Sequence, residues 1–248
     1  MEISRRLMAV ASLVKEGALA ADIGTDHGYV PIYLAEKKHC PHIIAMDINI
    51  GPLERAREHI REHGLENRIE TRLSDGMSEL KIGEADTVIA AGMGGRLVIE
   101  ILKNSPEIVE SVQEFILQPQ SDIHKVRAYL NENGFLLTEE DMIEEDGKFY
   151  PIMKLKHGCE SAYSEQELYF GRLLLKQRHS VLYHFLQKER KRLGKIQEGL
   201  RKQQGERAML RRRELDKEIA RICLGLLLYQ VADDCCKSNP EGGNTYAV

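Results

Sequence analysis

The sequence predicts an α/β domain, built on a mostly parallel sheet that ends in an antiparallel hairpin, followed by an α-helical domain. Three observations lead to this fold class. Residues 1–158 alternate short apolar runs with amphipathic segments, as βαβ units do. Asp146-Gly147 stands between two strand-like runs and is typical of a tight hairpin turn. From Ser164 onward, long charged segments with helical spacing replace the strand pattern.

In the first domain, the strand-like runs are short and apolar, and the helical segments carry apolar residues three or four positions apart. The predicted strands are Leu19–Ile23, Ile43–Asp47, Arg68–Leu73, Asp86–Ala91, Phe115–Gln118, Phe135–Ile143 and Lys148–Lys156. The predicted helices are one marked by Leu7, Val10, Ala11 and Val14, one that follows Gly28 and runs through Glu36, and three at Pro52–His63, Arg96–Lys103 and Ile123–Asn133. The carboxyl ends of the parallel strands then meet at one edge of the sheet, where open α/β sheets bind ligands.

The second domain carries two series of apolar residues at helical spacing. The first series is Leu186, Leu193 and Leu200 with Ile196 between them, and the second is Leu215, Ile219, Ile222 and Leu226. Gly205 lies between the series and is the predicted turn. We therefore expect two antiparallel helices with a hydrophobic seam, a coiled coil, over residues 159–228, and a disordered tail over residues 229–248.

Composition excludes several classes of protein. The chain is 42% hydrophobic and 30% charged, as soluble globular proteins are. It has no run of about 18 uncharged apolar residues and no N-terminal segment of signal-peptide character, so we expect a cytoplasmic protein with no membrane partner. The 5 cysteines are scattered, and their spacing indicates neither a disulfide framework nor a metal site.

The charge is divided unevenly along the chain. Residues 1–159 have a net charge of -9, whereas residues 160–230 have a net charge of +7. A basic helical module next to an acidic one favours a polyanionic partner such as a nucleic acid. The alternative is a basic surface that is simply solvated.

The most informative segment is the loop Asp22-Ile23-Gly24-Thr25-Asp26-His27-Gly28-Tyr29, which follows the first strand and opens a helix. Dinucleotide-binding loops bring pyrophosphate to a helix N-terminus through glycines. Here Asp22 and Asp26 flank the glycine, and two carboxylates would repel a pyrophosphate. They suit a cation, and S-adenosylmethionine offers an ammonium and a sulfonium. The loop therefore favours S-adenosylmethionine over a nicotinamide dinucleotide.

Acidic residues also follow the next two strands. Asp47 ends the second strand, where a carboxylate accepts both ribose hydroxyls of an adenosine. Asp75 follows the third strand, where it can accept from the adenine amine while Met77 packs on the ring. Either Asp alone is more often a helix N-cap, but three acidic positions at three successive strand ends point to one ligand. The predicted cofactor contacts are Asp22, Gly24, Thr25, His27, Gly28, Asp47, Ile48, Asp75, Gly76, Met77, Ala91 and Gly92.

The fourth strand ends in Ala91-Gly92-Met93-Gly94-Gly95, and we expect the substrate pocket here. Glycines allow a flat base to approach the backbone closely, and the next helix offers free N–H donors. The alternative is a glycine-capped turn without a ligand. Gln118-Pro119-Gln120 at the end of the fifth strand adds amides that can hold a base edge or complete a turn.

At these positions the chain resembles the bacterial TrmK family of tRNA (adenine-22-N1)-methyltransferases. The residues that carry the resemblance are the loop at 22–31, Ala-Gly-Met-Gly-Gly at 91–95 and Gln118-Pro119, together with the basic helical end of the chain. The resemblance implies a class I Rossmann-like methyltransferase domain, a coiled-coil domain that helps to hold tRNA, and methyl transfer from S-adenosylmethionine to N1 of adenine 22 in the tRNA D-arm. One departure is Arg172, which stands where we expect a proline in relatives.

Four residues are the predicted catalytic group: Asp26, Tyr29, Gly92 and Gly94. Neutral adenine N1 already has a lone pair, so no strong base is required, but the ring becomes cationic as the methyl bond forms. We assign Asp26 to stabilising that charge and Tyr29 to packing on the base or hydrogen-bonding it. His27 is either a base or a hydrogen-bonded scaffold residue.

Two other functions fit the same residues. The first is a class I methyltransferase of a small molecule or a protein, in which the helices form a dimer seam. The second is a non-catalytic module that binds S-adenosylmethionine and recruits a partner through the helical hairpin. The charge of +7 over residues 160–230 favours tRNA as the partner, because a seam needs no surplus of basic residues. We expect the enzyme to act as a monomer.

Overall fold

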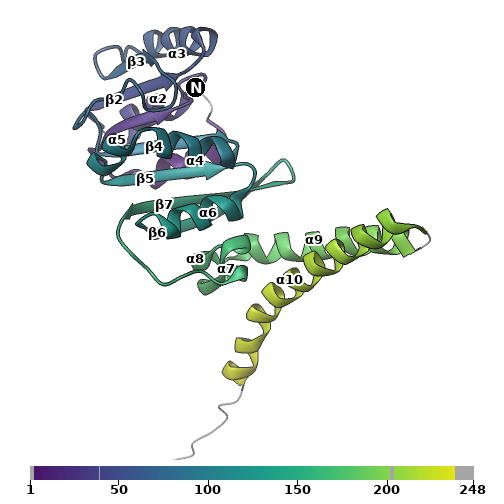
Figure 1. Ribbon diagram of the computed structural model, residues 1–248. Helices are drawn as coiled ribbons and strands as arrows, with labels where there is room; N and C mark the ends of the chain where they lie inside the picture. The colour runs from purple at the N-terminus through teal and green to yellow at the C-terminus, as the bar shows by residue number, and fades with distance from the viewer. Residues whose placement is uncertain (1–2, 39, 202–203, 238–248) are drawn as a thin grey trace, which may run out of the picture. The chain divides into compact units, whose positions relative to one another are not determined.

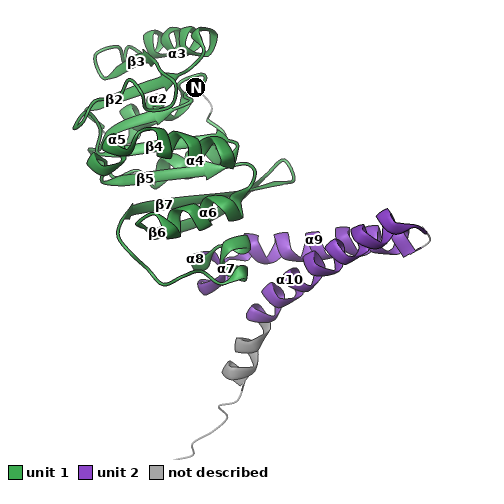
Figure 2. Cartoon of the chain, viewed as in Figure 1, with its two compact units in different colours: residues 1–173 green, residues 174–248 purple. Residues whose placement is uncertain are grey.

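The computed structural model describes residues 3–38, 40–201 and 204–237, with side chains as far as Tyr229. The chain divides into two compact units, residues 1–173 and residues 174–248 (Figure 2). The first unit is an α/β domain and the second is helical, so the predicted fold class is confirmed (Figure 1). None of the helices in these described ranges is long and apolar enough to cross a membrane.

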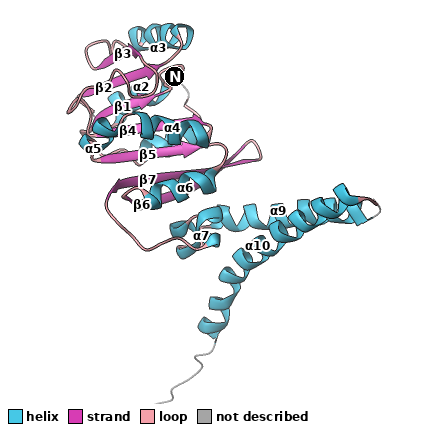
Figure 3. Cartoon of the chain, viewed as in Figure 1, coloured by secondary structure: helices cyan, strands magenta, loops and turns pink. Residues whose placement is uncertain are grey.

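A single mixed sheet organises the first unit (Figure 3). Its 7 strands lie in the order β3-β2-β1-β4-β5-β7-β6. Their bounds are β1 Leu19–Ile23, β2 His42–Asp47, β3 Ile69–Leu73, β4 Thr87–Met93, β5 Glu114–Pro119, β6 Phe135–Glu145 and β7 Lys148–His157. The strands β1 to β5 are parallel, and β7 is antiparallel to both β5 and β6. The strand order reverses at β1, between β2 and β4, so a crevice for a ligand is expected beyond the ends of these strands.

Helices cover both faces of the sheet, and each face has its own core. The helices of the first unit are α1 Arg5–Ser12, α2 Tyr29–Lys37, α3 Ile50–Glu62, α4 Gly95–Asn104, α5 Pro106–Ser111, α6 Ile123–Glu132 and α7 Glu165–Phe170. Buried residues of α1, α2 and α3, such as Leu34, share one cluster with Ile89 of β4. Residues of α4 and α6, such as Leu102, share the other cluster with Phe115 of β5. Because both faces are covered, β1 and β2 are buried along almost their whole length.

The predicted strands and long helices of the first unit are all present, with ends that differ by a few residues. The predicted hairpin turn is confirmed, since Asp146 and Gly147 both have positive φ (50° and 72°), as a type I′ turn requires. The fourth strand extends to Met93, beyond its predicted end at Ala91. Gly92, with φ 85°, lies where the register between β4 and β5 shifts, so the predicted glycine turn begins as a bulge in the strand.

The second unit is an antiparallel pair of helices, α9 (Ser180–Arg201) and α10 (Glu206–Lys237). Hydrogen bonds from the Arg212 side chain to the Leu200 carbonyl and from the Tyr229 hydroxyl to the His179 carbonyl show the antiparallel direction. Leu186 and Leu193 of α9 and Leu215 of α10 are buried, as the predicted seam requires. Before α9 comes the short helix α8 (Arg172–Lys176).

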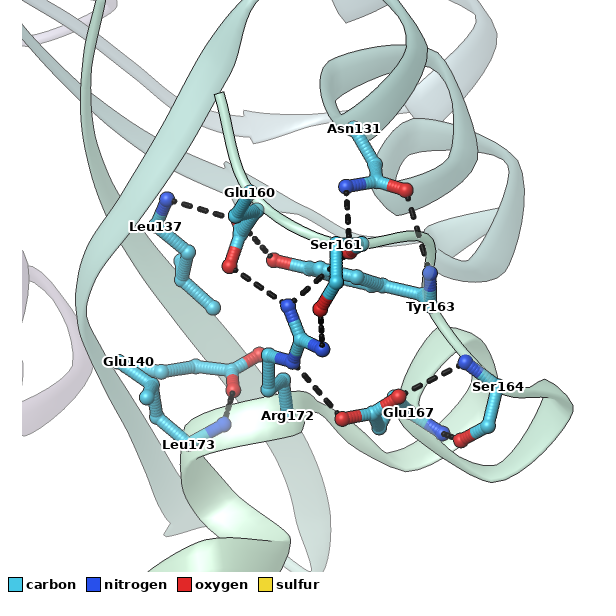
Figure 4. Close-up of polar contacts among 10 residues, drawn as sticks. All are labelled: Asn131, Leu137, Glu140, Glu160, Ser161, Tyr163, Ser164, Glu167, Arg172 and Leu173. Atoms are coloured by element: carbon cyan, nitrogen blue, oxygen red, sulfur yellow. Dashed lines mark hydrogen bonds and ion pairs between the residues drawn. The ribbon is translucent and has the colours of Figure 1, made fainter. Parts of the chain in front are cut away.

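Arg172 connects several residues at the end of the first unit (Figure 4). Its guanidinium donates to the carboxylates of Glu167 (2.8 Å) and Glu160 (2.9 Å), and to the Ser161 hydroxyl (2.7 Å). It also lies over the ring of Tyr163, 4.6 Å from the centroid. The burial of the Tyr163 phenol and its hydrogen bond to Glu160 raise the pKa of that tyrosine. Arg172 thus holds a loop and α7 together.

A buried ion pair completes this junction. The Glu140 carboxylate accepts from Arg127 Nε (3.0 Å) and Nη2 (2.8 Å), and the two side chains are 0% and 2% exposed. Its other oxygen accepts from the backbone N–H of Leu173 at 3.0 Å. Gly171 has no Cβ because one would lie 2.5 Å from the Glu140 carboxylate. The five N–H donors of arginine and the missing Cβ of glycine therefore determine the path of the chain here.

These contacts affect the predicted domain boundaries. Residues 159–173 pack within the first unit, whereas the sequence predicted a boundary at 158–159. The predicted functions of the three segments, methyl transfer by 1–158, tRNA binding by 159–228 and none for the tail 229–248, stay predictions. Helix α10 continues to Lys237, so residues 229–237 are helical instead of belonging to a disordered tail. The rest of the predicted tail, 238–248, lies outside the described residues.

Candidate active site

The loop between β1 and α2 is shaped by three residues in the left-handed region. Gly24, Asp26 and Gly28 have φ of 72°, 50° and 74°. The N–H groups of Gly24 and Thr25 both donate to the Met46 carbonyl, at 2.8 and 2.9 Å, which ties the loop to the end of β2. Glycine adopts such φ values freely, and aspartate is one of the few other residues that tolerates them. The predicted motif thus forms a tight loop at the reversal of strand order.

A cavity of about 530 Å³ opens at this loop. This volume is within the range of small-molecule sites, about 300–1,000 Å³. Four parts of the first unit contribute: the start of α1, the β1 loop with the start of α2, the end of β4, and the residue after β5. The lining residues are Ser4, Arg6, Leu7, Asp22, Gly24, Thr25, Asp26, Tyr29, Val30, Ala91, Gly92, Met93 and Gln120. The cavity therefore combines the loop predicted for the cofactor with the strand end predicted for the substrate.

Asp22 supplies a buried carboxylate to this cavity. The residue is 4% exposed, and burial raises the pKa of its carboxyl to about 7, with a smaller contribution from the Asp47 carboxylate. The neighbouring Thr25 hydroxyl is also buried and faces this carboxylate, and it lowers the pKa of Asp22 by less than burial raises it. A cationic ligand with N–H donors would neutralise the carboxylate and donate to the hydroxyl. Both observations fit an ammonium group here.

Asp47 lies at the end of β2, behind the loop. Its Oδ1 accepts from the Asn49 N–H at 2.8 Å, and its Oδ2 lies 3.4 Å from the Asp26 backbone nitrogen, which donates to it. The next residue, Ile48, is 58% exposed, which is unusual for isoleucine. The oriented Asp47 carboxylate can accept from a sugar hydroxyl, and the exposed Ile48 side chain can cover a flat ring.

The predicted contact residues after β3 differ in their exposure to solvent. Asp75 is exposed, and Gly76 has φ 58° and lies against Ile101 of α4. Met77 is 1% exposed and belongs to the hydrophobic core. Met77 is therefore a core residue in this structure, and its packing on an adenine ring stays a prediction.

Asp26 and its neighbours form a cluster of charged and aromatic side chains at the loop. Asp26 Oδ1 accepts from Arg55 Nη2 at 3.3 Å and lies 3.6 Å from His27 Nε2. The His27 ring stacks on the Tyr29 ring at 5.4 Å and on the His59 ring at 5.7 Å. His59 Nδ1 lies 2.9 Å from the His27 carbonyl oxygen. His27 thus makes scaffold contacts, whereas Asp26 and Tyr29 line the cavity.

The opposite wall is built on the end of β4. The side-chain oxygen of Gln118, which is fully buried, accepts from the Gly92 N–H at 3.1 Å and from Arg6 Nη1 at 2.7 Å. Met93 reaches across to the loop, since a Cβ on Gly24 would meet its terminal methyl group. Gly94 is the residue before α4 and lies next to Ser121. Gln118 therefore fixes the bulge at Gly92.

The structure brings together seven of the predicted site residues in the cavity lining, namely Asp22, Gly24, Thr25, Asp26, Tyr29, Ala91 and Gly92. The remaining predicted residues, all of them described, lie outside that lining: His27, Gly28, Asp47, Ile48, Asp75, Gly76, Met77 and Gly94. Sequence reasoning did not identify Ser4 or Arg6 as site residues, whereas it named Gln120, which lies in the lining, as an amide that can hold a base edge. The apolar spacing of the first helix indicates only its core-facing side, so Arg6 gave no signal.

The second unit has a groove of its own, with a volume of about 910 Å³. It is lined by Tyr183, Gln187, Arg190, Lys191, Gly194, Lys195, Glu198, Cys223, Leu226 and Leu227. Within the described part of the chain, Arg190, Lys191 and Lys195 form no ion pair, whereas Arg192 pairs with Glu189. Three unpaired cations beside an apolar floor suit a phosphate backbone.

No cluster of three or more His, Cys, Asp or Glu side chains in the described ranges is arranged to hold a metal ion. Of the cysteines whose side chains are described, Cys40 is buried, Cys223 is half-buried and Cys159 is exposed. The polar side chains of the cavity lining are carboxylates, hydroxyls, an amide and a guanidinium.

Comparisons with known proteins agree on one class. Residues 3–153 match a methyltransferase-domain family. The chain is 33% identical over 175 residues to the tRNA (adenine(22)-N(1))-methyltransferase of Bacillus subtilis (strain 168), a match that covers 70% of this chain and 74% of that protein.

Solved structures show the same similarity. The B. subtilis m1A22 tRNA methyltransferase TrmK aligns with a TM-score of 0.80 at 28% identity, over 91% of this chain and 99% of that one. M. capricolum TrmK, solved with the cofactor product S-adenosyl-homocysteine, aligns with a TM-score of 0.79 at 28% identity, over 92% of this chain and 99% of that one.

Proposed function

The chain belongs to the family of tRNA (adenine-22-N1)-methyltransferases, and from this membership we propose that it transfers a methyl group from S-adenosylmethionine to N1 of adenine 22 in the tRNA D-arm. The observation that carries the proposal is the cavity between the β1 loop and the end of β4. It holds a buried carboxylate next to a backbone wall rich in glycine. The enzyme acts as a monomer in the cytoplasm, and every residue assigned below comes from a single chain.

The residues of the β1 and β2 ends fit S-adenosylmethionine. Asp22 would pair with the ammonium of its methionine part, and Thr25 would bind the same group through its buried hydroxyl. Asp47 would accept the ribose hydroxyls, with Ile48 covering the adenine and Asp75 accepting from its amine. Gly24, Gly28 and Gly76, at positive φ, allow the tight turns that shape these loops. A pyrophosphate would meet Asp22 and Asp26, so nicotinamide dinucleotides are not expected to bind.

The residues on the other side of the cavity act on the acceptor base. Bound S-adenosylmethionine supplies an electrophilic methyl group on a sulfonium. The adenine N1 lone pair forms a bond to that methyl carbon, the methyl–sulfur bond breaks with its electrons going to sulfur, and the adenine ring gains the positive charge. Asp26 lines the cavity and stabilises this charge. Tyr29 packs on the base, and Gly92 and Gly94 let its flat face approach the backbone.

The helical hairpin supplies affinity for tRNA. Its groove carries Arg190, Lys191 and Lys195, all exposed and without ion pairs among the described residues. Contacts of such cations to phosphates are independent of sequence, so they hold the RNA while the cavity selects the base. The base must leave its stack to enter the cavity.

Nucleoside mapping tests the proposal. Unmodified tRNA that carries adenine at position 22 is incubated with the protein and S-adenosylmethionine, digested and analysed by mass spectrometry. We expect 1-methyladenosine at position 22 and no product from a transcript with guanine there. Methyl incorporation into protein or metabolite extracts, with none into tRNA, would favour a methyltransferase of another substrate. Binding of S-adenosylmethionine with no transfer to any of them would favour the non-catalytic module.

A further inference from the structure

Arg6 lies in the wall of the catalytic cavity and is held in a fixed orientation. It is the second residue of α1, in the first turn of the helix, which has Ser4 as its N-cap. Its Nη1 donates to the buried Gln118 side chain at 2.7 Å, and its guanidinium carbon lies 5.4 Å from the centre of the Tyr150 ring. Two contacts from two different strands thus orient a long side chain that would otherwise be mobile.

The charge of Arg6 has no carboxylate partner among the described residues. Other arginines of the first unit, such as Arg72, Arg127 and Arg172, each pair with a glutamate. Glu145 is near, but its Oε1 accepts from the Arg6 backbone N–H at 3.4 Å. The two carboxylates of the cavity, Asp22 and Asp26, form no ion pair with Arg6. Arg6 is the one cationic side chain in the lining of this cavity, all of which is described.

An oriented guanidinium without a counter-charge calls for an anionic ligand. The product of the proposed reaction is a cationic adenine, so a free guanidinium near it would oppose the reaction. A phosphodiester would remove that conflict, because it neutralises Arg6 before the base becomes positive. Arginine suits phosphate because its planar N–H groups can bind two oxygens at once. An extruded nucleotide brings its own phosphates to the mouth of the pocket.

We propose that Arg6 binds an RNA phosphate next to the target nucleotide and so positions the extruded base at the cavity. This inference rests on the proposed function and adds a second phosphate contact region, separate from the groove of the helical hairpin. Arg6 is a positioning residue, since it acts on the base through the phosphate. Gln118 supports it by holding the guanidinium and the Gly92 N–H on one oxygen.

Salt dependence distinguishes this role from a structural one. The rate of methylation of tRNA, as kcat/KM, is measured over a series of salt concentrations for the full-length protein and for Arg6→Ala. We expect kcat/KM at low salt to fall roughly 10- to 100-fold, the effect of a lost hydrogen bond to a charged group. We also expect the slope of log kcat/KM against log salt to become shallower by about 0.7 to 0.9, the contribution of one phosphate. The affinity for S-adenosylmethionine, measured by calorimetry, should stay the same.

Three further variants serve as controls. Arg5→Ala removes an exposed arginine from the adjacent position and should change neither rate nor slope. Arg6→Lys keeps the charge and should keep the slope. Arg6→Gln removes the charge but keeps a polar side chain, so the slope should again become shallower by about 0.7 to 0.9. It replaces Arg6→Ala if that variant does not fold.

The possible outcomes distinguish an error in the phosphate contact from an error in the proposed function. A lower rate with an unchanged salt slope in Arg6→Gln would overturn the phosphate contact and leave Arg6 as a support for Gln118. A loss of affinity for S-adenosylmethionine would also overturn it and assign Arg6 to the cofactor site. If the wild-type protein does not methylate tRNA at all, the proposed function itself is wrong.

Discussion

The two units of the molecule use charge in opposite ways. In the first unit several charges are buried: Asp22 in the cavity, and Glu140 with Arg127 at the junction. In the second unit the candidate charges, Arg190 and Lys191 among them, are exposed and surrounded by water. A buried charge must have a partner, so each one determines a geometry. Exposed charges are interchangeable and act by their number. One unit therefore provides selectivity and the other provides affinity.

The largest expected effect is the removal of the exposed charges together. A variant ending at residue 173 keeps the Arg172 contacts and should bind S-adenosylmethionine almost as tightly as the full chain. Its tRNA affinity should fall roughly 1,000-fold, since several phosphate contacts are lost. Titration with tRNA and calorimetry with S-adenosylmethionine measure the two. If the truncated protein keeps full affinity for tRNA, the hairpin has no part in RNA binding.

The junction gives the sharpest test of buried charge. Glu140→Gln leaves Arg127 without a counter-charge in the interior and should lower the free energy of unfolding by about 3–5 kcal/mol. Glu139→Gln is the matched control, because Glu139 is exposed and only pairs with Lys154 at 3.4 Å. Its expected effect is below about 1 kcal/mol. Urea denaturation of both variants decides the matter, and equal effects would contradict the distinction between buried and exposed charge.

The role of Asp26 in stabilising the charge on the base can be tested by removing the carboxylate. Asp26→Asn should lower the single-turnover rate about 100-fold at saturating tRNA with little change in tRNA affinity, because the carboxylate is assigned to charge that develops during transfer. Asparagine tolerates the φ of 50° at this position, so the change removes the charge and its ion pair with Arg55 without straining the backbone. Asp146→Asn, at the same φ in the β6–β7 turn, is the control for backbone effects. An unchanged rate in Asp26→Asn would leave Asp26 with a structural role only.

Asp22 predicts a pH dependence of cofactor binding. Its carboxyl has a pKa of about 7 in the free protein, and an ammonium ligand requires the ionised form. As the pH falls below 7, the site becomes protonated and the affinity for S-adenosylmethionine should decrease by up to about tenfold per pH unit. Calorimetry from about pH 5.5 to about pH 7.5 measures this. Asp22→Asn should bind weakly with no such slope, and a flat profile in the wild type would contradict the assignment.

Single exposed charges should have the smallest effects. Lys191→Ala should weaken tRNA binding about threefold at moderate salt and reduce the salt slope by about 0.7 to 0.9. Arg190→Ala and Lys195→Ala should do the same, and the three effects should add. A hundredfold loss from one of them would show that a groove residue acts specifically, as the buried charges do.

Sequence reasoning succeeded where local chemistry determines the outcome. The strands β1 and β2 were predictable because sheets covered on both faces need continuous apolar runs, and the β6–β7 turn because Asp-Gly suits positive φ. Helix α5 (Pro106–Ser111) was not predicted, since six residues are too few to show a period. Helix α7 is equally short, but the capping box of Ser164 and Glu167 is a local sequence signal for its first turn.

The candidate site was predictable only in part, for a different reason. Asp22 lies near the end of β1, and Gly24 and Asp26 lie in the loop that follows it, so their proximity is determined by local sequence. Arg6 reaches the same cavity only because α1 packs against the ends of later strands, which brings it to Gln118. Met77 shows the opposite case, since this predicted cofactor contact is buried in the hydrophobic core. Contacts between elements far apart in sequence leave no pattern in a single sequence.

The pairing of β1 with β4 has a consequence for the order of folding. Ala20 pairs with Thr87, so the wall of the cavity at Gly92 forms only after a long stretch of chain has closed. The helical hairpin is made of contacts nearer in sequence and should form faster. During refolding, helical signal from α9 and α10 should therefore recover first, and the capacity to bind S-adenosylmethionine last. Cofactor binding would then report that the sheet is complete.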